Sequence, residues 1–196
     1  CSPMLDITLA CHQLKSVEAV HVVAVNNECK ELLFVLRRNN SCACSIHCVN
    51  ILKDGMQQFV FAQADEASSA IAYSNGVGKY LYEPNSAIQK AGCSRVLAER
   101  FGIKKLHANS QVYTADILVA DFPGRVFEVV EVLGFSKADI KKAQALQKAN
   151  ITVRNFPESV QQLRKRLKLA DGGNCYIFAT TLVDERKVLV ICKKEK

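Results

Sequence analysis

The fold is decided by one stretch, residues 150–173, which reads NITVRNFPESVQQLRKRLKLADGG. Residues 151–156 are rich in β-branched and apolar side chains and predict a strand, and Pro157 then stands where a helix tolerates proline, in its first turn. Three apolar residues follow at helical spacing and are expected to point inward: Val160, Leu163 and Leu167. Asp171-Gly172-Gly173 predicts the end of this helix.

The segments on either side of this stretch continue the alternation of strands and helices. Residues 126–135 predict a strand, and Ser136 with Asp139 three residues later forms a capping box for a helix that runs to about residue 149. Downstream, residues 176–182 and 187–192 predict a hairpin. The order β-α-β-α-β-β predicts a compact α/β unit with two helices on a small mixed sheet.

The net charge of the chain is concentrated on this unit. Nine basic and two acidic residues lie between Ser136 and Leu169, so this segment carries the whole net charge of +7. Such a concentration favours docking of RNA or DNA, because the fields of neighbouring cations add on one face. The alternative is a solvated helix face rich in Lys and Arg. The candidate RNA-binding residues are Lys141, Lys142, Arg154, Arg164, Lys165, Arg166 and Lys168.

Composition and cysteine usage are those of a globular cytoplasmic protein. The chain has 196 residues, of which 49% are hydrophobic and 23% charged. It contains no apolar run of about 20 residues and no signal-peptide pattern at its start. Its nine cysteines are odd in number, and most are scattered through apolar runs, which favours reduced, buried thiols over a disulfide framework.

One cluster raises the question of a metal site, because four possible zinc ligands lie within seven residues: Cys42, Cys44, His47 and Cys48. Structural zinc sites need ligand pairs that converge from separate segments, and no second pair follows. A strand over residues 45–52 would place Cys44, Cys48 and Asn50 on one face and His47 on the other. The sequence therefore favours a Cys-rich strand edge, and we expect no metal.

The N-terminal elements look incomplete as a sheet. Residues 4–14 predict a helix with leucines 5, 9 and 14 on one side, and residues 18–25 form an almost continuous β-branched run, which suits a strand covered on both faces. Asn26-Asn27 offers a tight turn to a returning strand at residues 32–36, with a helix over residues 28–33 as the alternative. We expect the missing neighbouring strands to lie upstream of Cys1.

The middle of the chain predicts four features. Residues 46–52 and 58–61 form a hairpin across Asp54-Gly55, and Ser74–Gly78 predicts a linker. A single helix is expected from Pro84 to Phe101, ending at Gly102, with four residues inward: Ile88, Ala91, Val96 and Leu97. A short extended piece is expected within residues 106–114.

Several stretches carry a family resemblance: KYLYEPN (79–85), KLHANSQVYT (105–114), DFPGR (121–125) and the run at 150–173. Together they resemble the class I S-adenosylmethionine-dependent methyltransferases of Bacteroidetes that carry a THUMP-like domain at the C-terminus. The resemblance covers essentially the whole chain. Ala108 and Ala115 stand where proline and serine are expected in relatives, so the details of that loop are not carried over.

The resemblance implies an α/β fold with mixed sheets and three parts. Residues 1–76 are implied to be the C-terminal portion of a Rossmann-like methyltransferase domain with an added hairpin, residues 77–122 a ferredoxin-like or helical connector, and residues 123–196 a THUMP-like domain. The sequence has no glycine-rich loop after a first strand, and Gly76-Val77-Gly78 is too short to be one. We therefore expect no cofactor and no catalytic residue in this chain, with S-adenosylmethionine implied for a longer parent protein.

The resemblance implies that this chain docks RNA, either tRNA or rRNA, for a catalytic domain upstream. This implication is an analogy with the THUMP domains of RNA-modifying enzymes. Five residues are candidates for lining an interdomain groove, with capping and backbone hydrogen bonding as the alternative: Tyr82, Glu83, Asn85, His107 and Asn109. Two other functions stay open. One is a protein-interaction module that forms a homodimer through exposed strand edges, and the other is part of a small-molecule methyltransferase.

Overall fold

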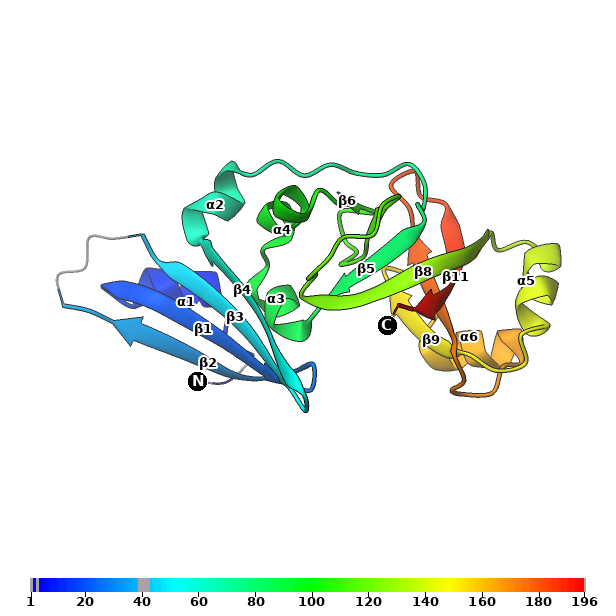
Figure 1. Ribbon diagram of the computed structural model, residues 1–196, viewed down its shortest axis with the longest axis horizontal. Helices are drawn as coiled ribbons and strands as arrows, with labels where there is room; N and C mark the ends of the chain where they lie inside the picture. Colours follow the sequence, from blue (N-terminus) through cyan, green and yellow to red (C-terminus); the bar gives the residue numbers. More distant parts are fainter. Residues whose placement is uncertain (1, 3, 39–42, 196) are drawn as a thin grey trace. The chain divides into compact units, whose positions relative to one another are not determined.

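The computed structural model describes residue 2 and residues 4–38 and 43–195. The chain forms two compact units, each containing one sheet (Figure 1). Unit 1 consists of Cys1–Ile71 and Pro84–Arg100, and unit 2 of Ala72–Glu83 and Phe101–Lys196. The three domain ranges implied by the resemblance differ from this division into two units, and they stay predictions.

The sheet of unit 1 has four strands in the order β2-β1-β3-β4. They are β1 (Val17–Val25), β2 (Glu28–Leu36), β3 (Ser45–Leu52) and β4 (Gly55–Ala62). β1 pairs antiparallel with β2 and parallel with β3, and β3 and β4 form the predicted hairpin. Asn26 and Asn27 make the predicted turn with φ of 49° and 64°, a left-handed conformation that asparagine tolerates. The strand predicted after this turn is confirmed, and the alternative helix over residues 28–33 is wrong.

The helices of unit 1 are short: α1 (Ile7–Gln13), α2 (Gln63–Ser68), α3 (Ser86–Ala91) and α4 (Ser94–Phe101). Asp6 caps α1 by accepting a hydrogen bond from the Leu9 amide at 2.8 Å. The helix predicted at residues 4–14 is present but starts later, and it buries Ile7 and Ala10 instead of its leucines.

The single helix predicted from Pro84 to Phe101 is wrong. Pro84 ends strand β5 (Tyr80–Pro84), and Asn85 caps α3. Gly92 then adopts φ 73° and separates α3 from α4. Proline suits both a first helical turn and the end of a strand, so the local pattern alone did not distinguish them. Ile88, Val96 and Leu97 are buried as expected, whereas Ala91 is only half-buried.

Unit 2 contains a seven-stranded sheet in the order β6-β7-β5-β8-β11-β10-β9. Besides β5, its strands are β6 (Lys104–Lys105), β7 (Tyr113–Ala115), β8 (Gly124–Leu133), β9 (Asn150–Arg154), β10 (Cys175–Thr181) and β11 (Lys187–Lys194). With helices α5 (Lys137–Gln144) and α6 (Val160–Leu167), the predicted order β-α-β-α-β-β is confirmed. The sheet is larger than expected, because the short strands β5, β7 and β6 continue it beyond β8.

The two faces of this sheet have separate cores. On one face, α5 and α6 pack against β9, β10 and β11 through Ala143, Leu163 and Leu167. On the other, residues such as Leu106 and Val112 pack against Phe127 and Phe178. The helices therefore occupy one face only, and the loop before β7 covers part of the other.

The boundaries of both helices in unit 2 differ from the prediction. α5 ends at Gln144 instead of near residue 149. α6 begins at Val160, which is 36% exposed instead of inward, and ends at Leu167, because the left-handed φ of 53° at the following Lys168 stops it before Asp171.

The predicted linker Ser74–Gly78 is packed within unit 2. The amide of Ser74 donates to the carbonyl of Lys105 at 3.0 Å, and the amide of Gly78 donates to Oγ1 of Thr114 at 2.8 Å. Val77 packs against one of the two cores.

The predicted fold class, α/β with mixed sheets, is confirmed. Within the described ranges, every helix is too short or too polar to cross a membrane.

Candidate nucleic-acid interface

Helix α5 presents two of the candidate cations. Ser136 caps it, since its hydroxyl accepts from the Asp139 amide at 3.2 Å while the Asp139 carboxylate accepts from the Ser136 amide at 3.2 Å. Hydrogen bonds from the Ser136 hydroxyl and amide lower the pKa of Asp139, and nearby Lys142 adds to the effect. Lys141 and Lys142 lie exposed in the last turn, where the helix dipole favours positive charge.

Helix α6 presents four more candidates. Ser159 and Gln162 form a second capping box, and Leu163 and Leu167 are fully buried. Burial of these leucines turns the other residues of the helix outward. The cations at its C-terminal end are Arg164, Lys165, Arg166 and Lys168. α5 and α6 contact each other, so the two sets of cations lie on neighbouring helices on the same face of the sheet (Figure 1).

Acidic neighbours pair with three of these six helix cations. Arg164 lies 2.6 Å from Asp171, Arg166 lies 2.5 Å from Glu158, and Lys142 lies 3.3 Å from Glu131. Arg166 also lies over the ring of Phe135, 4.5 Å from its centroid. Ion pairs this exposed contribute about 0–1 kcal/mol each, so a phosphate can displace the carboxylate at little cost. Among the residues that the structure describes, no acid pairs with Lys141, Lys165 or Lys168.

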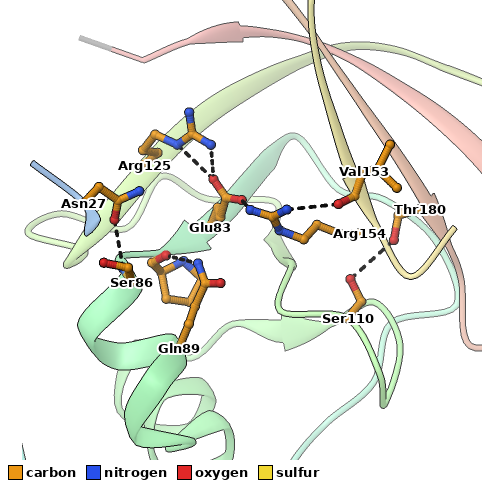
Figure 2. A network of polar contacts seen from close by, with 10 residues as sticks. Asn27, Glu83, Ser86, Gln89, Ser110, Arg125, Val153, Arg154 and Thr180 are labelled. Carbon is orange, nitrogen blue, oxygen red and sulfur yellow. Dashed lines mark hydrogen bonds and ion pairs between the residues drawn. The ribbon is translucent and has the colours of Figure 1, made fainter. Parts of the chain in front are cut away.

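The seventh candidate, Arg154, is separate from the helix cations. It lies in β9 and pairs with Glu83 of β5, with Nη2 of the arginine 2.6 Å from Oε1 of the carboxylate. Figure 2 shows this contact and the second bond of Arg154, to the Val153 carbonyl at 3.0 Å. The Nε atom of Arg154 is buried without a partner within the described part of the chain. Arg154 therefore ties strands together, and its Nη1 and Nη2 atoms donate to protein groups.

Glu83 is the centre of this network. Its side chain is only 1% exposed and accepts from Nε of Arg125 at 2.8 Å and also from Nη2 of that arginine (Figure 2). In a flat sheet the four steps from β5 to β9 would span about 19 Å. Because Arg154 nevertheless reaches Glu83, the sheet must curl, and the carboxylate holds β5, β8 and β9 together.

The other residues predicted to line a groove also make bonds inside the protein. The Tyr82 hydroxyl donates to the Ile117 carbonyl at 3.1 Å and accepts from the Val119 amide at 2.9 Å, and burial raises the pKa of Tyr82. Asn85 caps α3 through the Ile88 amide at 3.1 Å. These are the hydrogen bonds expected if the residues cap helices and bond backbone groups, which was the alternative to lining a groove.

His107 holds the loop before β7. Its Nδ1 accepts from the Asn109 amide at 3.0 Å and from the Asn155 side chain at 2.9 Å, which leaves Nε2 as the donor to Glu185 at 3.2 Å. Both Nδ1 partners are N–H groups, so this tautomer follows from the geometry. The role of these five residues in a groove stays a prediction.

The cysteine cluster does not assemble a metal site among the residues that the structure describes. Cys42 lies outside them. Cys48 and Asn50 are buried on one face of β3, and His47 stacks on His21 at the other face, 4.6 Å between ring centroids, as the alternation predicts. Burial, with Cys11 close by, raises the pKa of Cys44 to about 11, which disfavours the thiolate that metals bind.

Gly76-Val77-Gly78 does not fit a cofactor loop. A Cβ on Gly78 would lie 2.7 Å from Oδ1 of Asp116 and 2.8 Å from the Ala115 carbonyl, so protein atoms already fill the space beside it. The segment leads into strand β5 rather than into a helix N-terminus that could face the cofactor. The expectation that S-adenosylmethionine belongs to a longer parent protein stays a prediction.

Two of the features that the structure shows were missed from the sequence. Arg125 stood out only as part of the DFPGR motif, and no local pattern indicated its ion pair with Glu83, 42 residues away in sequence. The exposed face of the unit 1 sheet was also missed, because the almost continuous apolar run of β1 predicted a strand covered on both faces.

Comparisons with known proteins match these elements. Residues 124–194 match the family described as THUMP domain-like, and residues 80–123 match a ferredoxin-like domain. A solved structure from Porphyromonas gingivalis W83, described as a "putative methyltransferase", is 38% identical with a TM-score of 0.94. The match covers 100% of this chain and 50% of the Porphyromonas chain. No curated protein matches the chain.

The resemblance drawn from the motifs is confirmed at this level. The chain spans half the length of its solved relative. It is similar over its whole length to half of the Porphyromonas chain, and its residues 124–194 match the THUMP domain-like family.

Proposed function

We propose that the C-terminal module docks a structured RNA, such as tRNA or rRNA, for a methyltransferase domain. THUMP domains are generally RNA-binding, and residues 124–194 match a family described as THUMP domain-like. The observation that carries the proposal is the position of the charge. The segment with the whole net charge of +7 lies inside this module, and most of its cations lie on or at the end of two helices that contact each other.

Phosphate contacts supply the affinity. Lys141 on α5 and Lys165 and Lys168 on α6 are exposed, and so is Lys137, one helical turn before Lys141. Each lysine that meets a phosphate releases counterions, which makes binding salt-dependent and nearly independent of sequence. The paired cations Lys142 and Arg166 add contacts by exchanging carboxylate for phosphate, and the shape of the RNA provides the selectivity.

The methyl group comes from S-adenosylmethionine in the methyltransferase domain. The residues of this chain hold and orient the RNA, and none of them is assigned a step in the transfer. This division of labour accords with the description of the Porphyromonas relative as a "putative methyltransferase" and with the poor fit of Gly76-Val77-Gly78 to a cofactor loop.

A charge-matched pair of variants tests the proposal. Lys141→Ala, Lys165→Ala and Lys168→Ala are combined in one variant, and Lys15→Ala, Lys30→Ala and Lys53→Ala, all exposed in unit 1, in the other. Both variants lose the same net charge. We expect the first to weaken binding of a tRNA transcript about tenfold or more and to reduce the salt slope by about 1 per lysine. Filter binding at several salt concentrations measures both quantities.

Equal losses in the two variants would show that binding follows net charge instead of the helix face. That result, or unchanged affinity in the α5–α6 variant, contradicts the proposal.

A further inference from the structure

The two faces of the unit 1 sheet differ sharply in burial. Strand pairing places Val22, Leu32, Cys48 and Phe59 in one row, and Val20, Phe34, Ile46 and Phe61 in the next. Of these eight side chains, all but Phe34 are at most 6% exposed. α3 packs against β1, β2 and β3. This is the ordinary arrangement of helices on a sheet.

The residues between these rows form the opposite face, which we call the open face. One row consists of Leu33, His21, His47 and Val60, and the next of Glu31, Val23, Val49 and Gln58. A third contains Val25, Ile51 and Met56, and Val35 lies at the other end. The exposed aliphatic side chains of this face are Val25 (37%), Leu33 (49%), Val35 (40%), Ile51 (45%), Met56 (56%) and Val60 (43%).

Such a face is unusual for a sheet that meets water. A solvated sheet face is normally polar at every second residue, whereas here Val23, Val25, Val49 and Ile51 occupy those positions. β1 and β3 are also parallel, and parallel strands are normally covered on both faces. The charged residues that pair into these rows, Glu28 and Glu31, both belong to the edge strand β2. Apart from the stacked His21 and His47, the two central strands present valine and isoleucine on this face, which is typical of a surface that another element covers.

The Porphyromonas chain indicates what this element is. All of the present chain matches half of the Porphyromonas chain. The other half of the Porphyromonas chain is therefore an equal length of polypeptide that has no counterpart in the match. On the buried face of this sheet the covering elements are helices, and helices cover both faces of most sheets with parallel strands.

We propose that the open face binds the apolar side of helices. These helices belong to a polypeptide equivalent to the other half of the Porphyromonas chain, which is either joined to this chain or supplied separately. The surface belongs to unit 1, and the proposed RNA-binding cations belong to unit 2. The two proposals can therefore fail independently.

Matched variants at equal exposure test the inference. Val35 on the open face is 40% exposed, and Val132 on β8 of unit 2 is 41% exposed. Each is changed to Glu in the full chain, and the other half of the Porphyromonas chain is made as a separate polypeptide. We expect wild type and Val132→Glu to form a one-to-one complex in size-exclusion chromatography. Val35→Glu should weaken the complex at least tenfold, with tRNA binding unchanged.

A covalent version covers the case in which the separate half does not fold. In a fusion protein, the present chain replaces the matching half of the Porphyromonas chain. Urea unfolding is then followed for each variant, both in this fused chain and in the isolated chain. The expected result is a midpoint shift from Val35→Glu that is much larger in the fused chain, whereas Val132→Glu shifts both chains equally. Equal shifts overturn the proposal. So does a concentration-dependent dimer of the isolated chain that Val35→Glu abolishes, because a second copy would then cover the face.

Discussion

At the scale of single residues, the buried carboxylate of Glu83 organises unit 2. It is 1% exposed, and the two arginines that pair with it, Arg125 and Arg154, are 36% and 35% exposed. The desolvation of Glu83 is offset by three hydrogen bonds from guanidinium groups. Arg154 is separated from Glu83 by 71 residues in sequence, so no local pattern indicated the pair.

Glu83→Gln tests this organisation. The change leaves both arginines without a carboxylate, and removing one partner of a buried ion pair costs about 3 kcal/mol. All five tyrosines lie in unit 2 and the chain has no tryptophan, so tyrosine fluorescence during urea unfolding reports on unit 2 alone. Glu128→Gln, at an exposed position in β8, is the control and should change stability by less than about 0.5 kcal/mol. A loss of that small size for Glu83→Gln would contradict the tie between β5, β8 and β9.

His47 makes the stability of unit 1 depend on pH. Burial lowers the pKa of His47 below its usual 6.5, and the stacked His21 adds to this effect. The folded protein therefore binds the proton less tightly than the unfolded chain does. Stability is complete above about pH 6.5 and falls as the pH drops through that value.

Urea unfolding followed by far-UV circular dichroism should give a lower midpoint at about pH 5 than at about pH 7.5. His47→Gln should reduce this difference, and His12→Gln, at an exposed position in α1, should leave it unchanged. A pH dependence identical in wild type and His47→Gln would show that other groups cause it.

At the scale of elements, the backbone at Gly92 sets the break between α3 and α4. Its φ of 73° is left-handed, and no atom lies within 4 Å of the position that a Cβ would occupy. Gly92→Ala should therefore cost about 1 kcal/mol through conformation alone. Gly76 is equally uncrowded and does not adopt a positive φ, so Gly76→Ala should be neutral or slightly stabilising. Thermal unfolding by circular dichroism compares the two, and equal effects would contradict a conformational origin.

The elements predicted correctly from the sequence are those specified by neighbouring residues. The capping box at Ser136, the Asn26-Asn27 turn and the alternation in β3 each depend on residues a few positions apart. Pro84 was misassigned because its place in β5 depends on a sheet whose other strands are distant in sequence. The type and order of elements were therefore largely predictable, and several of their ends were not.

The candidate interface was predictable only in part, for the same reason. The sequence located the cations on α5 and α6, since helical spacing determines which side of each helix is buried. It did not show that Glu131 and Asp171, outside the helices, would pair with Lys142 and Arg164. Nor did it show that Arg154 would pair with Glu83 of a strand distant in the sheet order. Long-range ion pairs depend on how the strands are arranged, which composition and spacing do not contain.

At the scale of the whole molecule, each unit offers one surface of distinct chemistry. Unit 2 presents cations on α5 and α6, and unit 1 presents the apolar open face of its sheet. Electrostatic docking of a polyanion is weakened by salt, whereas burial of apolar surface is not. The two surfaces can therefore be studied separately by the choice of ionic strength.

The salt dependence of RNA binding by the unmodified chain tests the central claim most directly. Filter binding of a tRNA transcript between about 50 and about 200 mM salt should show the logarithm of the association constant falling linearly with the logarithm of the salt concentration. With Lys137, Lys141, Lys165 and Lys168 each meeting a phosphate, we expect a slope of about −3 to −4. Absence of binding at the lowest salt, or binding that does not change with salt, would contradict the claim that this module docks RNA.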